Sequence, residues 1–596
     1  MNSKPKEDQH PLRRFWKDLR SKVVHSVLWR YDAVEGYRPI TVRLLRIRMS
    51  EAIVLSLPFL ILIGVYVFGA LVEHHKYNQA VEKNEPLTMD LFHLHLHDRL
   101  TQDWRRLMIP DLDGKSNLPV YAIRLSNEAL ETIERNLPPG EDAGAGYVEG
   151  YVSRKKKAMK AEFRIRGSRH WNWITPQKSW KVRLHNNHYL DGRDVFSFVN
   201  PVDPLPFAEE LILDMAREQD LLSPEYHPVR LTMNNAYMGL YFYMAQPDEN
   251  LLRKGNRFPG NLYSGDGAPK DPDTGVSALF ESSEYWKRPA TLAGTPKEDR
   301  TDLDALLYAL NKMDLVQFRE YANSHIDLQR FATLDALDVV FGGDQHDYAE
   351  NHKLYFDPYR GKVEPIAWNF SGWEHSPRLS RVENPIQLRL KEIPGYLDMR
   401  NRIAYRLING PCSPEAIKTR SAARMNEVAP ALLADPFWDA YRLMPDVSRY
   451  YRQMVRPMDF ERQSLVFDAR MQVYRNRWRF LMDTLEQGVV EATVMRHESL
   501  QTVEFSIDGN NSVRLDAWLC HGESVPLKAF ADGDLDGRFE ADIDRSVTDF
   551  PHLRNLAPGF YLSPRRTVNE NRGAVRLETT PQHYRFFVAP NNDCPG

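Results

Sequence analysis

Gly343-Asp344-Gln345-His346-Asp347-Tyr348-Ala349-Glu350-Asn351 lies just before a strand-like apolar segment, 353–356. A second apolar run, 363–368, ends at Asn369. Acids and amides therefore follow or precede two predicted strands, where functional loops are usually found. Phosphoryl transfer requires such groups, because a carboxylate orients the attacking hydroxyl and oxygen ligands hold Mg²⁺. An Asp/Asn-rich turn between two hairpin strands would give the same pattern, so this stretch alone leaves both interpretations open.

The composition limits the class of protein. A chain of 596 residues is too long for one ordinary core, so we expect about two to four domains. The net charge of -3 provides no overall basic field, and we therefore expect no nucleic-acid partner. The three cysteines, Cys412, Cys520 and Cys594, have no metal-binding or CxxC spacing, which argues against a disulfide framework.

An apolar run without a charged residue, 52–72, is long enough to cross a bilayer. Basic residues precede it and acidic Glu73 follows it. The positive-inside rule therefore predicts a transmembrane helix over 51–73, a basic cytoplasmic tail over 1–50, and an extracytoplasmic or periplasmic location for the rest. A cleaved signal peptide and a buried core helix are the alternatives. We expect a single-pass protein of the inner, cytoplasmic membrane, whose tail either contacts anionic lipid or only sets the orientation.

The remaining chain divides by its patterns into three parts. Residues 74–110 are polar and predict a stalk. Residues 111–487 mix strand-like alternation with helical spacing, which predicts an α+β domain whose C-terminal part is helical. Among its expected elements are a helix over 127–135, a hairpin over 227–244 with the turn at Asn234-Asn235, and a glycine-containing loop over 261–267. Residues 488–596 alternate like short strands between turns and predict a separate β-sandwich-like domain.

Two further motifs could bind ligands. A strand feeding the turn Arg166-Gly167-Ser168, followed by Lys178 at the start of the next strand, can cover and grip phosphates, although a plain hairpin would look similar. Asp532, Asp534 and Asp536 alternate and are followed by Gly537, like the first half of a calcium loop. Position twelve of that loop is Ile543 instead of glutamate, so calcium at 532–544 competes with an acidic hairpin turn.

Together, the motifs over 118–375 resemble the spore-coat-protein-H (CotH) kinase family, which has an atypical protein-kinase-like fold. The matching segments occur in the family's order: Arg166-Gly167-Ser168 with Lys178-Ser179-Trp180; Tyr237-Met238-Gly239-Leu240-Tyr241 with Asp248; Asp344 with Asn351-His352-Lys353-Leu354-Tyr355; and Trp368-Asn369-Phe370-Ser371. The resemblance implies ATP and Mg²⁺ as cofactors if the protein is active.

The resemblance also assigns roles to particular residues. Asp344, or Asp347 in another alignment, becomes the candidate catalytic base, and Asn351 a candidate metal ligand. Arg166 and Lys178 become candidate nucleotide-binding residues.

Three positions depart from the family's pattern. Asn369 stands where the family has a metal-binding aspartate, Ser371 replaces a second acid, and Ala245 replaces a glutamate. An amide brings no negative charge to a hard dication, so Mg²⁺ would bind more weakly at Asn369.

Three functions follow from these patterns. The first is a degenerate pseudokinase that acts as a binding or scaffolding module in envelope assembly, with envelope proteins or polymer-assembly factors as partners. The second is an active atypical kinase that phosphorylates an envelope protein. The third, suggested by Trp171, Trp173 and Trp180, is a carbohydrate-associated factor, although these tryptophans would serve equally well as core packing.

Overall fold

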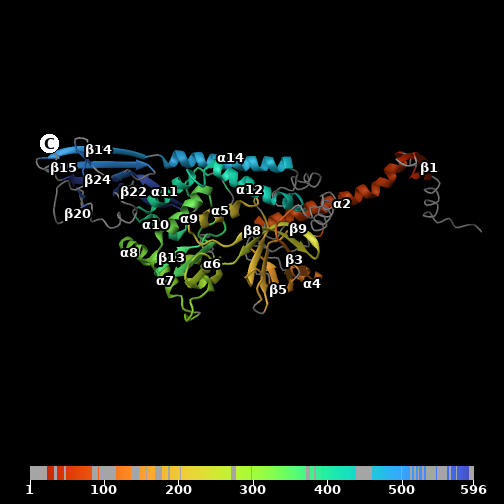
Figure 1. The fold of residues 1–596 in the computed structure, drawn as a ribbon, viewed down its shortest axis with the longest axis horizontal. Coiled ribbons are helices and arrows are strands. Elements are labelled where there is room, and N and C mark those ends of the chain that lie inside the picture. Colours follow the sequence, from red (N-terminus) through yellow and green to blue (C-terminus); the bar gives the residue numbers. More distant parts are fainter. Residues whose placement is uncertain are drawn as a thin grey trace, which may run out of the picture. The chain divides into compact units, whose positions relative to one another are not determined.

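A computed structural model gives the fold (Figure 1). The chain separates into two compact units, Met1–Thr101 and Gln102–Gly596, which are described separately. The residues that the structure describes are 23–32, 36–45, 49–82, 92, 116–135, 146–155, 157–167, 177–185, 188–201, 203, 205–266, 268–269, 277–296, 298–370, 373, 376–380, 384–393, 395–437, 460–486, 488–497, 500–509, 513–515, 518–520, 523–525, 529–531, 545–546, 560–562, 565–571, 574–580 and 582–588.

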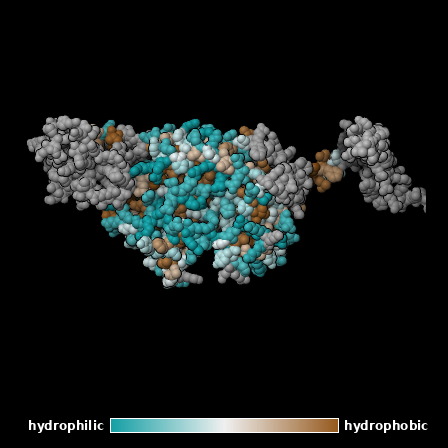
Figure 2. All heavy atoms as spheres, viewed as in Figure 1, coloured by the Kyte–Doolittle hydropathy of each residue, from teal (hydrophilic) through white to brown (hydrophobic). Residues whose placement is uncertain are grey.

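The first unit contains a hairpin and one long helix. Strands β1 (Val23–Asp32) and β2 (Gly36–Leu45) pair antiparallel from Val23↔Leu45 to Asp32↔Gly36, whereas the sequence predicted only a basic tail. Helix α2 (Met49–Glu82) contains the predicted apolar run, and its segment Ser56–Glu73 is long and apolar enough to cross a membrane. Many of its large apolar side chains are exposed, and they form a brown group in Figure 2. A solvent-exposed apolar helix of this length is typical of a membrane anchor.

The second unit begins with a closed barrel of seven strands in the order β3-β4-β5-β6-β7-β9-β8. Their bounds are β3 (Val120–Leu125), β4 (Val148–Arg154), β5 (Lys157–Ile165), β6 (Trp180–Leu184), β7 (Val195–Val199), β8 (Tyr226–Met233) and β9 (Ala236–Ala245). Neighbours are antiparallel except β3 and β8, whose parallel pairing closes the barrel. Alternating apolar side chains fill its interior, as the period of a strand requires.

Two predicted elements of this barrel region are confirmed. Helix α4 (Asn127–Arg135) has the predicted bounds. The β8–β9 turn lies at Asn234 and Asn235, which adopt φ of 49° and 67°. A two-residue turn with positive φ at both positions matches the twist of a hairpin, and asparagine tolerates this conformation.

A second sheet and a group of helices follow the barrel. The sheet has the order β11-β10-β12-β13 and comprises β10 (Asn261–Gly265), β11 (Lys287–Ala290), β12 (His352–Asp357) and β13 (Lys362–Pro365). The glycine-containing loop predicted over 261–267 is therefore wrong for its first five residues, which form β10. Antiparallel pairing with β12 stabilises this short segment as a strand, although its glycine disfavours strand formation.

The helices that follow pack mostly around one extended hydrophobic core, and one of them contributes Leu251 and Leu252 to a separate, smaller cluster. They are α5 (Ala208–Glu218), α6 (Glu249–Lys254), α7 (Thr301–Lys312), α8 (Leu315–His325), α9 (Leu328–Phe341), α10 (Pro385–Lys391), α11 (Tyr396–Ile408), α12 (Pro414–Leu433) and α14 (Phe460–Leu485). Short 3₁₀ turns lie at Ala278–Phe280 and Ser283–Tyr285. The helical C-terminal part that the sequence predicted for this region is present.

Strand β9 contains a glycine that fixes a contact with the end of α12. Gly239 has φ of 99°, and a Cβ at this position would lie 2.3 Å from a carboxylate oxygen of Asp435. That carboxylate accepts hydrogen bonds from Leu240 N–H at 2.8 Å and from Gln177 at 3.2 Å. A side-chain carboxylate therefore occupies the space that the absent Cβ of Gly239 leaves open.

The residues of the C-terminal region that the structure describes, from Gly488 to Val588, all lie in strands. They are β14 (Gly488–His497), β15 (Leu500–Gly509), β16 (Val513–Leu515), β17 (Trp518–Cys520), β18 (Glu523–Val525), β19 (Ala529–Ala531), β20 (Arg545–Ser546), β21 (Phe560–Leu562), β22 (Arg565–Asn571), β23 (Ala574–Thr580) and β24 (Gln582–Val588). Five of them form the sheet β14-β15-β24-β19-β20, and the others form two-stranded pairs. The part of this region that the structure describes does not define the two packed sheets of a sandwich.

Candidate phosphate-binding cleft

A large cavity, of about 1480 Å³, lies between the barrel and the β10–β13 sheet. Strands β5 and β6 contribute Arg164 and Lys181, and the segment after β5 contributes Arg166. From the other side come Asp266, directly after β10, and Lys353 in β12. The cleft therefore brings cationic side chains from two separate sheets to one space.

Lys353 is held rigidly at the base of this cleft. Its side chain is only 2% exposed. The ammonium donates hydrogen bonds to Ser264 Oγ at 2.5 Å and to the Asp266 carboxylate, and it lies 4.9 Å from the centre of the Trp368 ring. Burial acts to raise the pKa of Asp266, but the nearby charge of Lys353 outweighs burial and leaves that pKa below its ordinary value. Asp266 is thus an anion that fixes the position of the lysine.

Lys181 lies in the same cleft and lacks such a partner. Among the described residues it forms no ion pair, and its environment includes Arg164, Arg166 and Lys287. Burial and repulsion by the two arginines lower its pKa to about 8. Positive charges that outnumber their carboxylate partners in a half-buried space are arranged to attract an anion.

Two asparagines lie together at the side of the cleft, and both have left-handed backbone conformations. Asn351 has φ of 73° and Asn369 has φ of 52°. The amide of Asn369 donates to Asn351 Oδ1 at 2.9 Å, and the amide of Asn351 donates to the carbonyl oxygen of Gln345 at 2.9 Å. The Gln345 contact fixes the orientation of the Asn351 amide, with its oxygen toward Asn369. The structure therefore joins the two sequence motifs by a direct side-chain hydrogen bond.

A buried histidine holds together the two segments that carry Asn351 and Asn369. His346 is only 3% exposed; its Nδ1 lies 2.8 Å from a carboxylate oxygen of Asp338, and its Nε2 lies 2.8 Å from the carbonyl oxygen of Trp368. Burial acts to lower the pKa of His346, but the Asp338 carboxylate outweighs it and raises the pKa. A protonated imidazole donates to both acceptors, so His346 ties the loop after α9 to the segment that carries Asn369.

Glu209 adds a carboxyl group close to the backbone of Asn369. It lies in the first turn of α5 and lines the cleft. Burial raises its pKa to about 7, although Arg166, the Tyr226 hydroxyl and the backbone N–H of Asn369 act in the opposite direction. The group is therefore close to half-protonated near neutral pH.

The comparison with known families agrees with these motifs. A sequence model of the family described as "CotH kinase protein" matches residues 163–466, about half of the chain. The chain belongs to the CotH kinase family. It is also similar to the protein named inner spore coat protein H of Bacillus subtilis (strain 168), with 20% identity over 341 residues, which cover 55% of this chain and 91% of that protein. The resemblance seen in the sequence is thereby confirmed.

Of the residues to which the CotH motifs assign a role, Arg166, Asn351 and Asn369 line the cleft together. Asp344, Asp347 and Lys178 are not among the described residues that line it. Asp344 accepts a hydrogen bond from Gln345, and Asp347 accepts the backbone N–H of Ala349 at 2.8 Å, as in a local turn. Their catalytic roles stay predictions.

Other positions from the sequence lie elsewhere or outside the described residues. The backbone carbonyl of Lys178 accepts a hydrogen bond from the Tyr241 hydroxyl. Ala245 is buried in β9. Asp248 is an exception, because it lines the cleft while it also caps α6 and pairs with Arg193. Ser168, Trp171, Trp173, Ser371 and the calcium motif with Asp532, Asp534 and Asp536 lie outside the residues that the structure describes.

Four charged residues that shape the CotH cleft were given no role in the sequence: Lys181, Glu209, Asp266 and Lys353. The alternation in Trp180-Lys181-Val182 was a usable signal, because Trp180 and Val182 are buried and Lys181 must face the other side of the strand. The pairing of Lys353 with Ser264 and Asp266 had no such signal, since it depends on two strands that are far apart in sequence.

Proposed function

We propose that this CotH family member is a membrane-anchored binding or scaffolding protein whose cleft holds the phosphates of a nucleotide without efficient phosphoryl transfer. The observation that carries the proposal is the convergence of Arg166, Lys181 and Lys353 on one cavity beside Asn369. Lysine is a compact point charge and arginine a planar donor, and both are common ligands of phosphate. ATP carries several phosphates, so the cations from the two sheets could each contact a different phosphate.

The donor set next to these cations does not fit Mg²⁺ well. Asn351 and Asn369 offer neutral amide oxygens, and one of these already accepts the Asn369 amide. Among the described residues, no group of three or more His, Cys, Asp or Glu side chains is arranged to hold a metal ion. Magnesium prefers carboxylates and substrate phosphates. We therefore assign phosphate binding to the protein's own cations and no catalytic step to a metal.

The membrane and envelope parts of the proposal rest on other observations. Helix α2 exposes a long apolar segment, and basic residues precede it in sequence. The positive-inside rule would then put the CotH region on the extracytoplasmic side of the inner membrane. The name of the Bacillus relative refers to a spore coat. We propose a corresponding role in envelope assembly, with an envelope protein or polymer-assembly factor as partner.

Thermal unfolding of the full chain with ATP tests the proposal. We expect ATP to raise the midpoint temperature, because a ligand that binds only the folded state stabilises it. The Kd for ATP derived from this shift should be the same in Mg²⁺ as in EDTA, within about twofold. A shift that requires Mg²⁺ would contradict the degenerate site, and no shift in either condition would contradict nucleotide binding.

The pH dependence of ATP binding should report Lys181. Its pKa of about 8 means that the ammonium form predominates below pH 8, and a bound phosphate should raise this pKa further. Affinity is then full below pH 8 and falls as pH rises through the pKa, by up to about tenfold per pH unit. We expect ATP titrations from pH 7.5 to 9.5 to show this loss. Lys181→Arg should flatten the profile, because the guanidinium stays charged.

An active kinase is the second candidate, and the carboxyl groups of Glu209 and Asp266 in the cleft favour it. In this reading, Asp344 would orient the acceptor hydroxyl. Incubating the full chain with γ-labelled ATP and Mg²⁺ separates the two candidates. Transfer of label that disappears in Asp344→Ala would establish the kinase, whereas ATP binding without transfer would support the binding module.

A further inference from the structure

Helix α14 contributes a further cation to the phosphate-binding cleft. Arg470 lines the cleft together with Asn369 and Phe370. Its Nη1 donates a hydrogen bond to the carbonyl oxygen of Trp373 at 3.4 Å. The match to the CotH family model ends at residue 466, so the family's motifs assign no role to this arginine. Arg470 therefore brings a positive charge to the segment in which the family has a metal-binding aspartate.

The packing of α14 fixes the position of Arg470. Tyr474, one turn further along the helix, is buried and packs against Trp373, with the ring centres 5.5 Å apart. Arg477, two turns from Arg470, is only 1% exposed and donates to backbone carbonyl oxygens of α9 and of the segment 376–379. Residues four and seven positions apart lie on the same face of a helix. The face that carries Arg470 is thus anchored beside the cleft.

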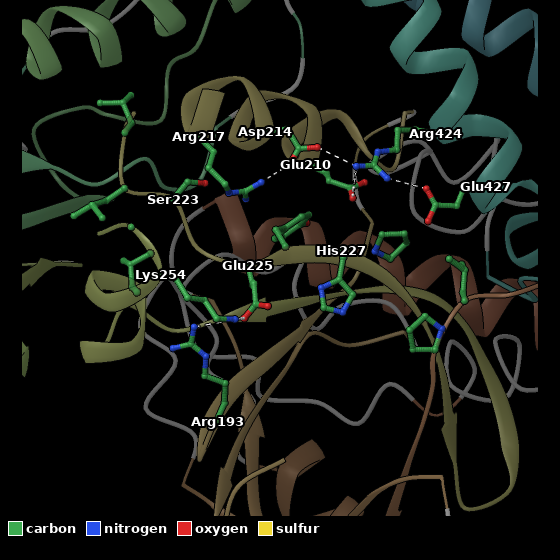
Figure 3. Close-up of a pocket in the computed structure, with 18 of the residues that line it drawn as sticks. Arg193, Glu210, Asp214, Arg217, Ser223, Glu225, His227, Lys254, Arg424 and Glu427 are labelled. Atoms are coloured by element: carbon green, nitrogen blue, oxygen red, sulfur yellow. Dashed lines mark hydrogen bonds and ion pairs between the residues drawn. The ribbon is translucent and has the colours of Figure 1, made fainter. Parts of the chain in front are cut away.

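Arg470 differs from the cations of a second cavity, which has a volume of about 700 Å³ and is lined by residues of β8, α5, α6 and α12 (Figure 3). The cationic side chains labelled there each pair with a carboxylate, namely Arg193 with Asp248, Arg217 with Asp214, Lys254 with Glu225 and Arg424 with Glu427. Arg470 forms no ion pair with any residue that the structure describes. A cation that lines a cavity without a carboxylate partner is available to an anionic ligand.

Cations at both ends of the segment 368–373 disfavour a metal ion there. At one end, Arg166 and Lys353 lie 6.0 and 4.9 Å from the centre of the Trp368 ring. At the other end is Arg470, bonded to the carbonyl of the last residue. Like charges repel, so a dication is disfavoured in this part of the cleft, whereas phosphate oxygens are attracted to it.

We propose that the guanidinium of Arg470 takes the place of Mg²⁺ in this protein and binds the phosphates of the nucleotide directly. The inference rests on the proposed function, because it assigns a ligand to the phosphates that the cleft holds. In an active kinase, metal ions bridge the phosphate oxygens and neutralise their charge. A guanidinium neutralises the same charge through its own hydrogen bonds and needs no carboxylate to hold it. The amide of Asn369 suits this arrangement, since an aspartate in this segment would compete with the phosphates for the cations.

The affinity for ATP in EDTA and in excess Mg²⁺ tests the proposal, measured by calorimetric titration of the full chain in detergent. The wild type should have the same Kd in both conditions. For Arg470→Met, we expect at least tenfold weaker binding in EDTA, because a hydrogen-bonded charge is lost. In Mg²⁺ the loss should be about threefold or less, since the metal that ATP carries neutralises part of the phosphate charge. The variant should thus acquire a dependence on Mg²⁺ that the wild type lacks.

Two further variants make the result specific. Arg470→Lys keeps the charge but not the planar fork, and it should weaken ATP binding in EDTA by only about threefold. Arg479→Met is the matched control, because Arg479 lies on the same helix, is exposed and is not among the residues that line the cleft. Its affinity should equal that of the wild type in both conditions. Circular dichroism and the unfolding temperature without ATP should show all three variants folded.

Three results would overturn the proposal, and they differ in what they imply for the proposed function. Unchanged affinity in a folded Arg470→Met protein would exclude the arginine as a phosphate ligand and leave nucleotide binding intact. An equal loss in EDTA and in Mg²⁺ would show that the arginine is an ordinary contact and does not replace the metal. Wild-type binding that requires Mg²⁺, or no binding at all, would contradict the proposed function itself and this inference with it.

Discussion

Lys353→Met is expected to weaken ATP binding by at least tenfold. The lysine supplies a pre-positioned charge, since Ser264 and Asp266 hold its ammonium and the side chain is only 2% exposed. Hydrogen bonds to charged groups contribute about 1.5–3 kcal/mol, which corresponds to roughly ten- to hundredfold in affinity. Methionine preserves the packing of the stem but leaves the Asp266 carboxylate without its partner. That carboxylate would then repel the phosphates. Calorimetric titration with ATP in EDTA measures the effect.

Two further variants make this result specific. Lys312→Met removes a lysine at the exposed end of α7 and should leave ATP affinity unchanged. The double variant Lys353→Met/Asp266→Asn removes the repelling carboxylate as well, and it should recover part of the lost affinity and of the unfolding temperature. Wild-type affinity in a folded Lys353→Met protein would show that the phosphates do not bind at this end of the cleft.

The local elements of the fold could be predicted because they depend on short-range signals. The helix-ending segment Pro138-Pro139-Gly140 limited the predicted helix to the bounds observed for α4, and the Asn234-Asn235 pair placed the β8–β9 turn. Closure of the barrel could not be predicted in this way. It depends on the parallel pairing of β3 with β8, which joins Val120 to Arg230 across a large part of the domain. Strand β10 was missed for the same reason, because its partner β12 lies far along the chain.

The residues of the cleft also divide into those that the sequence indicated and those that only the three-dimensional packing brings together. Asn351 and Asn369 were found because each stands in a contiguous motif at a strand end, and the structure joins them by a hydrogen bond. Lys353 was quoted as part of a motif without a role, since its chemistry comes from Ser264 and Asp266 on the neighbouring strand. Glu209 lies on a helix that the sequence predicted, but its position beside Asn369 is set by the packing of α5. Sequence motifs thus indicated where the site is, and strand pairing decided which cations line it.

Asn369→Asp is expected to make both stability and nucleotide binding depend on Mg²⁺. The Asn369 amide donates to Asn351 Oδ1 at 2.9 Å, and Gln345 fixes the Asn351 amide so that it cannot easily turn. An aspartate would place a carboxylate oxygen against this carbonyl oxygen, with the Glu209 carboxyl nearby. Without metal, we expect a loss of about 1–3 kcal/mol in the free energy of unfolding. A cation between the oxygens would remove the repulsion, so Mg²⁺ should restore stability and strengthen ATP binding at least tenfold.

The effect of Asn369→Asp should come from the added charge and not from backbone strain. Its φ of 52° lies in the left-handed region, which aspartate tolerates nearly as well as asparagine. Asn235→Asp is the matched control, because Asn235 is exposed in the β8–β9 turn and has φ of 67°. That variant should unfold like the wild type with or without Mg²⁺. If Asn369→Asp also unfolds identically in EDTA and Mg²⁺, then the amide at 369 is not what weakens metal binding. The difference from an active kinase would in that case have to lie elsewhere in the cleft.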